Sequence, residues 1–68
     1  MSKNHPANAH LKIKAYRHGL RAGRRNPTVP IEQPRKRWIS RHRDEPIRRF
    51  LEYWQEGFRD GQMDGGAL

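Results

Sequence analysis

Apolar residues recur three and four positions apart over two stretches of this chain, which is the spacing of one face of an α-helix. The first stretch predicts a helix over about residues 9–25, with Asn8 as its N-cap. Its apolar residues fall on one half of the helix and its basic residues on the other. Asn26 and Pro27 end it, because a residue that precedes proline is pushed out of the α region.

The second stretch predicts a helix over about residues 45–61. Asp44, Glu45 and Pro46 form a strong start signal, because they supply an acidic N-cap, an acid in the first turn and an early proline. This helix is also amphipathic, with aromatic and aliphatic residues on one face and charged residues on the other.

The stretch between the two helices, residues 26–43, is expected to be a connector. Residues 26–34 contain three prolines, which favours an extended or turn-rich path and argues against a strand. Residues 35–43 are rich in arginine and contain a tryptophan. Two outcomes are open for them: a short third helix opened by Pro34, or an irregular segment that a partner orders.

Both predicted helices carry the same glycine pattern. “YRHGLRAG” (16–23) and “WQEGFRDG” (54–61) each read aromatic, two residues, Gly, large apolar, Arg, any residue, Gly. Glycine inside a helix costs roughly 0.5–1 kcal/mol relative to alanine, so its repetition needs a reason. The glycines lie on the apolar faces, and we expect them to allow close backbone approach. The predicted packing residues are Tyr16, Gly19, Leu20, Gly23, Phe50, Trp54, Gly57, Phe58 and Gly61.

These elements predict an all-α protein, a small two-helix hairpin with a long proline- and arginine-rich connector. A helix-swapped or antiparallel homodimer would use the same faces. Residues 1–7 are expected to be a flexible tail, residues 8–63 a single small domain, and residues 64–68 a frayed end. A 68-residue chain with 32% hydrophobic residues has a small core, so a partner or a second copy would help to stabilise it.

The basic residues are concentrated in one part of the chain. Residues 1–43 hold twelve Lys and Arg against one acid, a net charge of +11, whereas residues 44–68 carry a net charge of −3. Arginine forks match phosphate oxygens and stack on bases, and an exposed Trp38 could stack on an unpaired base. The alternative is a solvated face that keeps the protein soluble. The candidate nucleic-acid-binding residues are Lys14, Arg17, Arg21, Arg24, Arg25, Arg35, Lys36, Arg37, Trp38, Arg41 and Arg43.

The remaining polar residues suggest no chemistry. Glu52, Glu56, Asp60 and Asp64 form an acidic stripe that nearby arginines, including those of the first helix, would neutralise, or that would dock on a basic protein. The four histidines are expected to be polar surface residues. No cofactor motif, metal-ligand spacing or catalytic set is recognisable, and the chain lacks cysteine, so we expect no enzyme. No signal core or membrane span is present, which predicts a cytoplasmic protein with no membrane partner.

Two segments, “AYRHGLRAGRRNP” (15–27) and “YWQEGFRDG” (53–61), resemble the ribosome modulation factor family of bacteria, phages and mobile elements. The resemblance covers about 22 of the 68 residues, and the connector is longer here than in that family. It implies a two-helix fold and a basic protein that binds the small ribosomal subunit and its RNA and promotes inactive ribosome dimers. The residues that match the family pattern, in structural roles, are Tyr16, Gly19, Ala22, Gly23, Asn26, Pro27, Trp54 and Gly57.

Three functional hypotheses follow. The leading one is a small non-enzymatic protein that binds RNA, most plausibly on the ribosome, as a modulator of translation or hibernation. The rival is an inhibitor encoded by a phage or plasmid that binds a host protein, such as a CRISPR complex or another nucleic-acid machine. A DNA-binding regulator is weaker, because the connector over 26–43 is too long and proline-rich for a helix-turn-helix.

Overall fold

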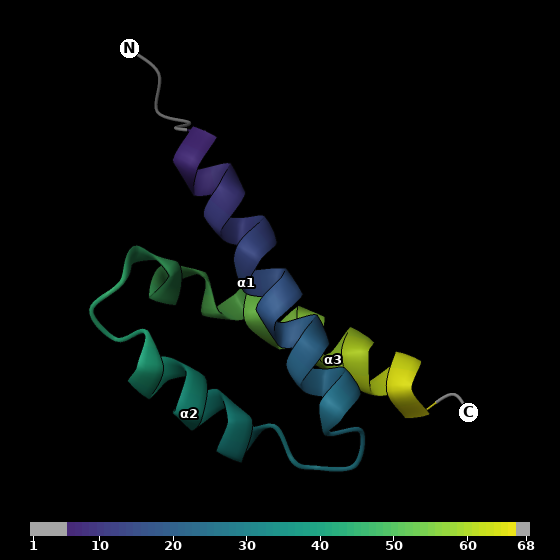
Figure 1. Cartoon of the computed structure of the whole chain (residues 1–68). Helices are drawn as coiled ribbons and strands as arrows, with labels where there is room; N and C mark the ends of the chain where they lie inside the picture. Colours follow the sequence, from purple (N-terminus) through teal and green to yellow (C-terminus); the bar gives the residue numbers. More distant parts are fainter. Residues whose placement is uncertain (1–5, 67–68) are drawn as a thin grey trace.

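The computed structural model describes residues 6–66, and this part of the chain is helical with no strand (Figure 1). It contains α1 (Pro6–Arg25), α2 (Glu32–Arg41), the 3₁₀ helix η1 (Pro46–Phe50) and α3 (Leu51–Gly66), which continues directly from η1. The all-α prediction is therefore confirmed. None of these helices is long and apolar enough to cross a lipid bilayer.

The two long helices, α1 and α3, pack against each other in parallel. Gly19 lies against the backbone of Trp54 and Phe58, and Gly23, one turn further on, lies against Phe58 and Gln62. The contacts advance in the same direction along both helices, so the predicted two-helix hairpin is not confirmed. The connector explains the difference, because α2 runs back along the molecule, so that η1 and α3 begin partway along α1, where Lys12 lies over the rings of Phe50 and Tyr53 (Figure 1).

The repeated glycines bring the two helix backbones into contact, as the sequence predicted. A Cβ atom at Gly57 would lie 2.9 Å from the Leu20 nitrogen, and one at Gly61 would lie 2.9 Å from the Arg24 nitrogen. Real Cβ atoms do not approach backbone atoms so closely, so neither position accepts a side chain without a shift of the helix. The same geometry underlies small-residue packing between membrane helices. Here it joins two parallel helices of one chain.

The hydrophobic core lies where α1, α2 and η1 meet the aromatic face of α3. Trp54 and Phe58 are fully buried and stack at 5.2 Å between ring centroids. Ala15, Ile47 and Trp38 complete the buried set. The remaining predicted packing side chains, Tyr16, Leu20 and Phe50, are half-buried at its edge. The core is therefore small and depends on a few aromatic rings.

The first helix begins earlier than predicted. Residues 6 and 7 belong to α1 and not to a tail, and Asn8 lies inside the helix, so it is not the N-cap. Proline suits the first position of a helix because its missing N–H has no partner there in any case. The end of α1 is as predicted: the backbone N–H of Asn26 donates to the Ala22 carbonyl at 3.1 Å, and the helix stops before Pro27. Residues 1–5 of the predicted tail lie outside the described residues.

The helix predicted over residues 45–61 corresponds to η1 and α3, and it differs from the prediction at both ends. Glu45, and not Asp44, is the N-cap, its side chain makes no capping bond, and the first turn is 3₁₀. At the other end the helix continues to residue 66, whereas a frayed end was predicted from residue 64. The parallel arrangement accounts for this, because Asp64 accepts a hydrogen bond from Arg24 at 2.7 Å and Gly65 packs against the Arg24 backbone. Residues 67–68 lie outside the described part.

The connector contains the ten-residue helix α2. Of the two outcomes left open for residues 35–43, a short third helix is therefore the one observed. α2 starts at Glu32, two residues before Pro34, and a proline in the first turn is tolerated because its N–H would be unpaired there. The turn before α2 is tied to α3: the Gln62 amide donates to the carbonyls of Asn26 (2.9 Å) and Val29 (2.7 Å). The connector is thus an ordered part of the fold.

Candidate nucleic-acid interface

The helix α2 is attached to the α1–α3 pair by side chains and not by close backbone packing. The Trp38 indole stacks on Trp54 at 5.8 Å between ring centroids, and its Nε1–H donates to His18 Nδ1 at 3.2 Å. The Arg35 guanidinium donates to Gln55 Oε1, also at 3.2 Å. Trp38 therefore acts as a spacer that holds α2 away from α1, and the space beside it stays open.

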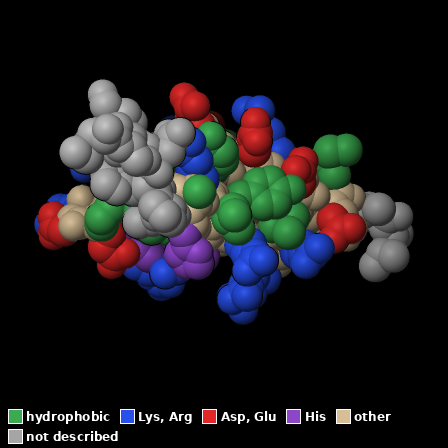
Figure 2. Space-filling model, turned by 90° about the horizontal axis from the view of Figure 1, so that it is seen from above, with side chains coloured by type: hydrophobic (Ala, Val, Ile, Leu, Met, Phe, Trp, Pro, Cys, Tyr) green, Lys and Arg blue, Asp and Glu red, His purple; other side chains and the backbone are tan. Residues whose placement is uncertain are grey.

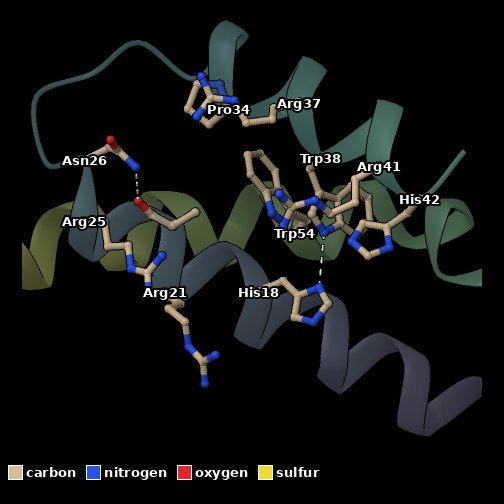
Figure 3. Close-up of a pocket in the computed structure, with 11 residues that line it drawn as sticks. His18, Arg21, Arg25, Asn26, Pro34, Arg37, Trp38, Arg41, His42 and Trp54 are labelled. Atoms are coloured by element: carbon tan, nitrogen blue, oxygen red, sulfur yellow. Dashed lines mark hydrogen bonds between the residues drawn. The ribbon is translucent and has the colours of Figure 1, made fainter.

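That space is a cavity of about 410 Å³ between α1 and α2 (Figure 3). Its apolar lining residues, which we call the floor, are Ala22, Pro34, Trp38 and Trp54. The polar groups around it come from both helices and from the turn that follows α1: His18, Arg21, Arg25, Asn26, Arg37, Arg41 and His42. The described lining residues include no Asp or Glu. We call this cavity with its four arginines the arginine groove.

The four arginines form two rows on the two helices that line the cavity. Arg21 and Arg25 are four residues apart on α1, and Arg37 and Arg41 are four residues apart on α2. All four are exposed, and none forms an ion pair with another described residue. In Figure 3 the Arg21 and Arg25 side chains both extend away from α2, so they lie at the rim of the groove. Like charges at this spacing repel one another, and a bound anion would relieve that repulsion.

The structure divides the predicted binding residues into groups. Arg21, Arg25, Arg37 and Arg41 come together in the arginine groove. Four others lie outside it: exposed Lys14 and Arg17 on α1, exposed Lys36 on α2 and exposed Arg43 in the loop before η1. The remaining two are engaged elsewhere, since Arg35 bonds Gln55 and Arg24 pairs with Asp64.

The assignment of Trp38 to base stacking is corrected by its burial. Its side chain is only 7% exposed, because one ring face lies on Trp54 and the His42 ring lies 5.1 Å from its centroid. In the sequence, arginines surround Trp38 and the apolar positions of this segment are few. The pattern therefore predicts an exposed aromatic side chain.

Two histidines belong to this site, although the sequence suggested only surface roles for them. His18 and His42 are half-buried, and their ring centroids lie 5.5 Å apart beside Trp38. His42 Nδ1 also lies 2.8 Å from a carboxylate oxygen of Glu45. One sequence signal could have found His42, because it is four residues from Trp38 and thus on the same side of α2.

The pKa of His18 is lowered from its usual value. Burial is the main cause, and the positive charges of His42, Lys14 and Arg21 add to it, whereas Glu45 acts in the opposite direction. The hydrogen bond agrees with this direction, since His18 Nδ1 accepts the proton of Trp38 and must be unprotonated to do so. The neutral ring is therefore the form that fits the folded protein.

Acid should consequently destabilise the protein through His18. The unfolded chain binds a proton at this residue near pH 6.5, whereas the folded protein binds it only at lower pH, so the free energy of unfolding should fall as the pH drops below about 6.5. Denaturant unfolding at neutral and mildly acidic pH measures this. His18→Gln can still accept the Trp38 proton but does not titrate, so it should flatten the pH dependence. His10→Gln, at an exposed position of the same helix, should leave it as in the parent protein; equal slopes for both variants would contradict the assignment.

The acidic stripe lies on α3. The Tyr16 hydroxyl donates to Asp60 at 2.6 Å, and this hydrogen bond is the main reason why the pKa of Tyr16 is raised. Arg24 crosses from α1 to Asp64, as the sequence predicted for arginines of the first helix. Both partners of that pair are exposed, so it contributes little, about 0–1 kcal/mol. Glu52 and Glu56 form no ion pair with another described residue.

The surface is therefore unevenly charged. On the face seen in Figure 2, histidines and several lysines and arginines gather along the lower edge, next to hydrophobic side chains in the middle. Within residues 6–66, no three His, Asp or Glu side chains gather as metal ligands would.

Comparison with known proteins adds no assignment. No protein-family model matches the chain, and searches of curated proteins and of solved structures give no significant match. The functional argument therefore rests on the residues and their geometry.

Proposed function

We propose that this chain is a small RNA-binding protein without catalytic activity, and that the arginine groove is its binding face. The observation that carries the proposal is that two helices place four exposed arginines, none in an ion pair with another described residue, around one cavity whose described lining holds no acid. Arginine guanidinium groups bind phosphate oxygens in pairs, which suits a nucleic-acid backbone. The net charge of +8 adds long-range attraction to such a partner.

The ribosome is the RNA partner that we propose first. The support is the resemblance of residues 15–27 and 53–61 to the ribosome modulation factor family, which suggests a modulator of translation or hibernation. The glycines in these segments join α1 to α3. The part that resembles the family is therefore the scaffold, and α2, which supplies half of the groove, lies outside the two segments that carry the resemblance.

The salt dependence of binding tests the proposal. Single-stranded RNA should bind at low ionic strength, and four phosphate contacts predict a slope of about −3 in log K against log salt, or a loss of about 50-fold between 50 and 200 mM salt. Fluorescence anisotropy with a labelled oligonucleotide measures this, and co-sedimentation with ribosomes tests the larger target. Absence of RNA binding at low salt, or a slope near zero, would exclude the proposal.

A protein partner is the second candidate, and one observation favours it. Glu52 and Glu56 are exposed on α3 without a described ion-pair partner, and Tyr53 beside them is 38% exposed. Such a face fits a basic surface of another protein, as the inhibitor of a nucleic-acid machine would require. Affinity capture after nuclease treatment separates the two: a stoichiometric protein that remains bound favours this candidate, and loss of all partners favours RNA.

A further inference from the structure

The arginine groove combines two chemically different surfaces. Its cationic lining, which we call the rim, includes Arg25 and Arg41 from opposite helices, and its apolar floor consists of Ala22, Pro34, Trp38 and Trp54. A simple phosphate-binding patch would need only the rim. An apolar floor under a cationic rim fits a ligand that has a flat, weakly polar body and an attached anion, and a nucleotide has this composition.

We propose that the groove admits one unpaired nucleotide of the bound RNA, with its phosphate at the arginine rim and its base over the apolar floor. This inference rests on the proposed function and specifies its substrate class as single-stranded RNA. The cavity of about 410 Å³ is in the range of small-ligand sites and offers room for one nucleotide. A base pair cannot enter it, because a paired base must first leave its stack.

One polar group is placed to contact the base. The Asn26 amide nitrogen donates to the Ala22 carbonyl at 2.8 Å, which fixes the amide and leaves its oxygen without a partner among the described residues. That oxygen is a hydrogen-bond acceptor at the α1 end of the cavity. It favours bases that carry an exocyclic amino group. Adenine, cytosine and guanine are therefore expected to bind better than uracil.

Adenosine 5′-monophosphate, adenosine and inorganic phosphate are the probes for this site. The chain has two tryptophans and both line the cavity, so their indole N–H resonances report on occupancy. The Trp38 resonance should shift when adenosine 5′-monophosphate is added. Adenosine alone and inorganic phosphate alone should each bind at least about 10-fold more weakly, because neither contacts both the rim and the floor. A single-stranded oligoadenylate should bind at least about 10-fold more tightly than a duplex of equal length at the same salt.

A blocking variant separates insertion of a base from attraction of the backbone. Ala22→Leu places a larger side chain in the floor and leaves every arginine in place, so it should abolish binding of the monophosphate and the preference for single strands. Ala9→Leu, at an exposed position of the same helix, is the matched control and should behave as the parent chain. Circular dichroism checks that both variants are folded.

The outcomes distinguish this inference from the proposed function. If RNA binds with the predicted salt slope but duplex and single strand bind equally, or if the monophosphate leaves the Trp38 resonance unchanged, the inference is wrong and the RNA-binding proposal stands. If no RNA binds at low salt, both fail. Competition between the monophosphate and the oligoadenylate in the unsubstituted protein supports the inference even if Ala22→Leu does not fold.

Discussion

Gly19→Ala is expected to unfold most of the protein at room temperature. Its Cβ atom would lie 2.8 Å from the Phe58 nitrogen and closer still to the Trp54 carbonyl oxygen. Both are backbone atoms of α3, so no side chain can rotate away and the helices must separate. Overpacking costs about 1–3 kcal/mol where side chains can adjust, and more where they cannot. A core of this size supplies only about 3–5 kcal/mol.

Thermal unfolding followed by circular dichroism measures this effect. Gly65→Ala makes the same change in α3, but its Cβ atom would meet the Arg24 carbonyl oxygen at 3.1 Å, so a small shift accommodates it. Because alanine favours a helix over glycine by up to about 1 kcal/mol, this control should stay within about 1 kcal/mol of the parent chain. A Gly19→Ala variant that melts at the parent temperature would show that the helices do not touch at this point.

Replacing all four groove arginines by glutamine should weaken RNA binding by about 100-fold or more at low salt. The substituted residues are Arg21, Arg25, Arg37 and Arg41, which are exposed and free of described ion pairs. Glutamine keeps much of the side-chain length and a good helix propensity, so the fold should persist. Removal of the repulsion between neighbouring arginines should leave stability unchanged or slightly increased. Anisotropy titrations at several salt concentrations measure both the affinity and its slope.

The matched control removes four other arginines: Arg43, Arg48, Arg49 and Arg59. The net charge falls by the same amount, but none of these residues lines the arginine groove. This control variant should lose far less affinity for RNA and keep most of the slope of log K against log salt. In the groove variant that slope should become less steep by about 3. Equal losses in the two variants would mean that total charge, and not the groove, determines binding.

The scaffold could be predicted from the sequence to the level of helices and their contact faces. The repeated glycines lie on the apolar faces, and close backbone approach is a physical compensation for their cost that the sequence pattern favours. The relative direction of the two helices could not be predicted, because a glycine pattern on each helix does not specify whether they run parallel or antiparallel. The direction depends on the path of the connector, and its three prolines gave no sign of the helix Glu32–Arg41 that turns the chain back.

The site could be predicted only as a list of basic residues. Arg21 and Arg25 lie on the predicted first helix, but nothing local indicates that Arg37 and Arg41 face them across a cavity. That pairing depends on Trp38, which stacks on Trp54 and holds α2 at a distance. A long-range contact between two side chains leaves no periodic signal. For the same reason His18, the hydrogen-bond partner of Trp38, was not recognised as part of the site.

The arginine side-chain N–H resonances of the protein, followed by nuclear magnetic resonance during titration with single-stranded RNA, test the central claim most directly. The account predicts that the Nε–H signals of Arg25, Arg37 and Arg41 shift early and together, while those of Arg48 and Arg59 stay in place. Shifts confined to the arginines of η1 and α3, or spread evenly over all arginines, would contradict the assignment of RNA binding to the groove between α1 and α2.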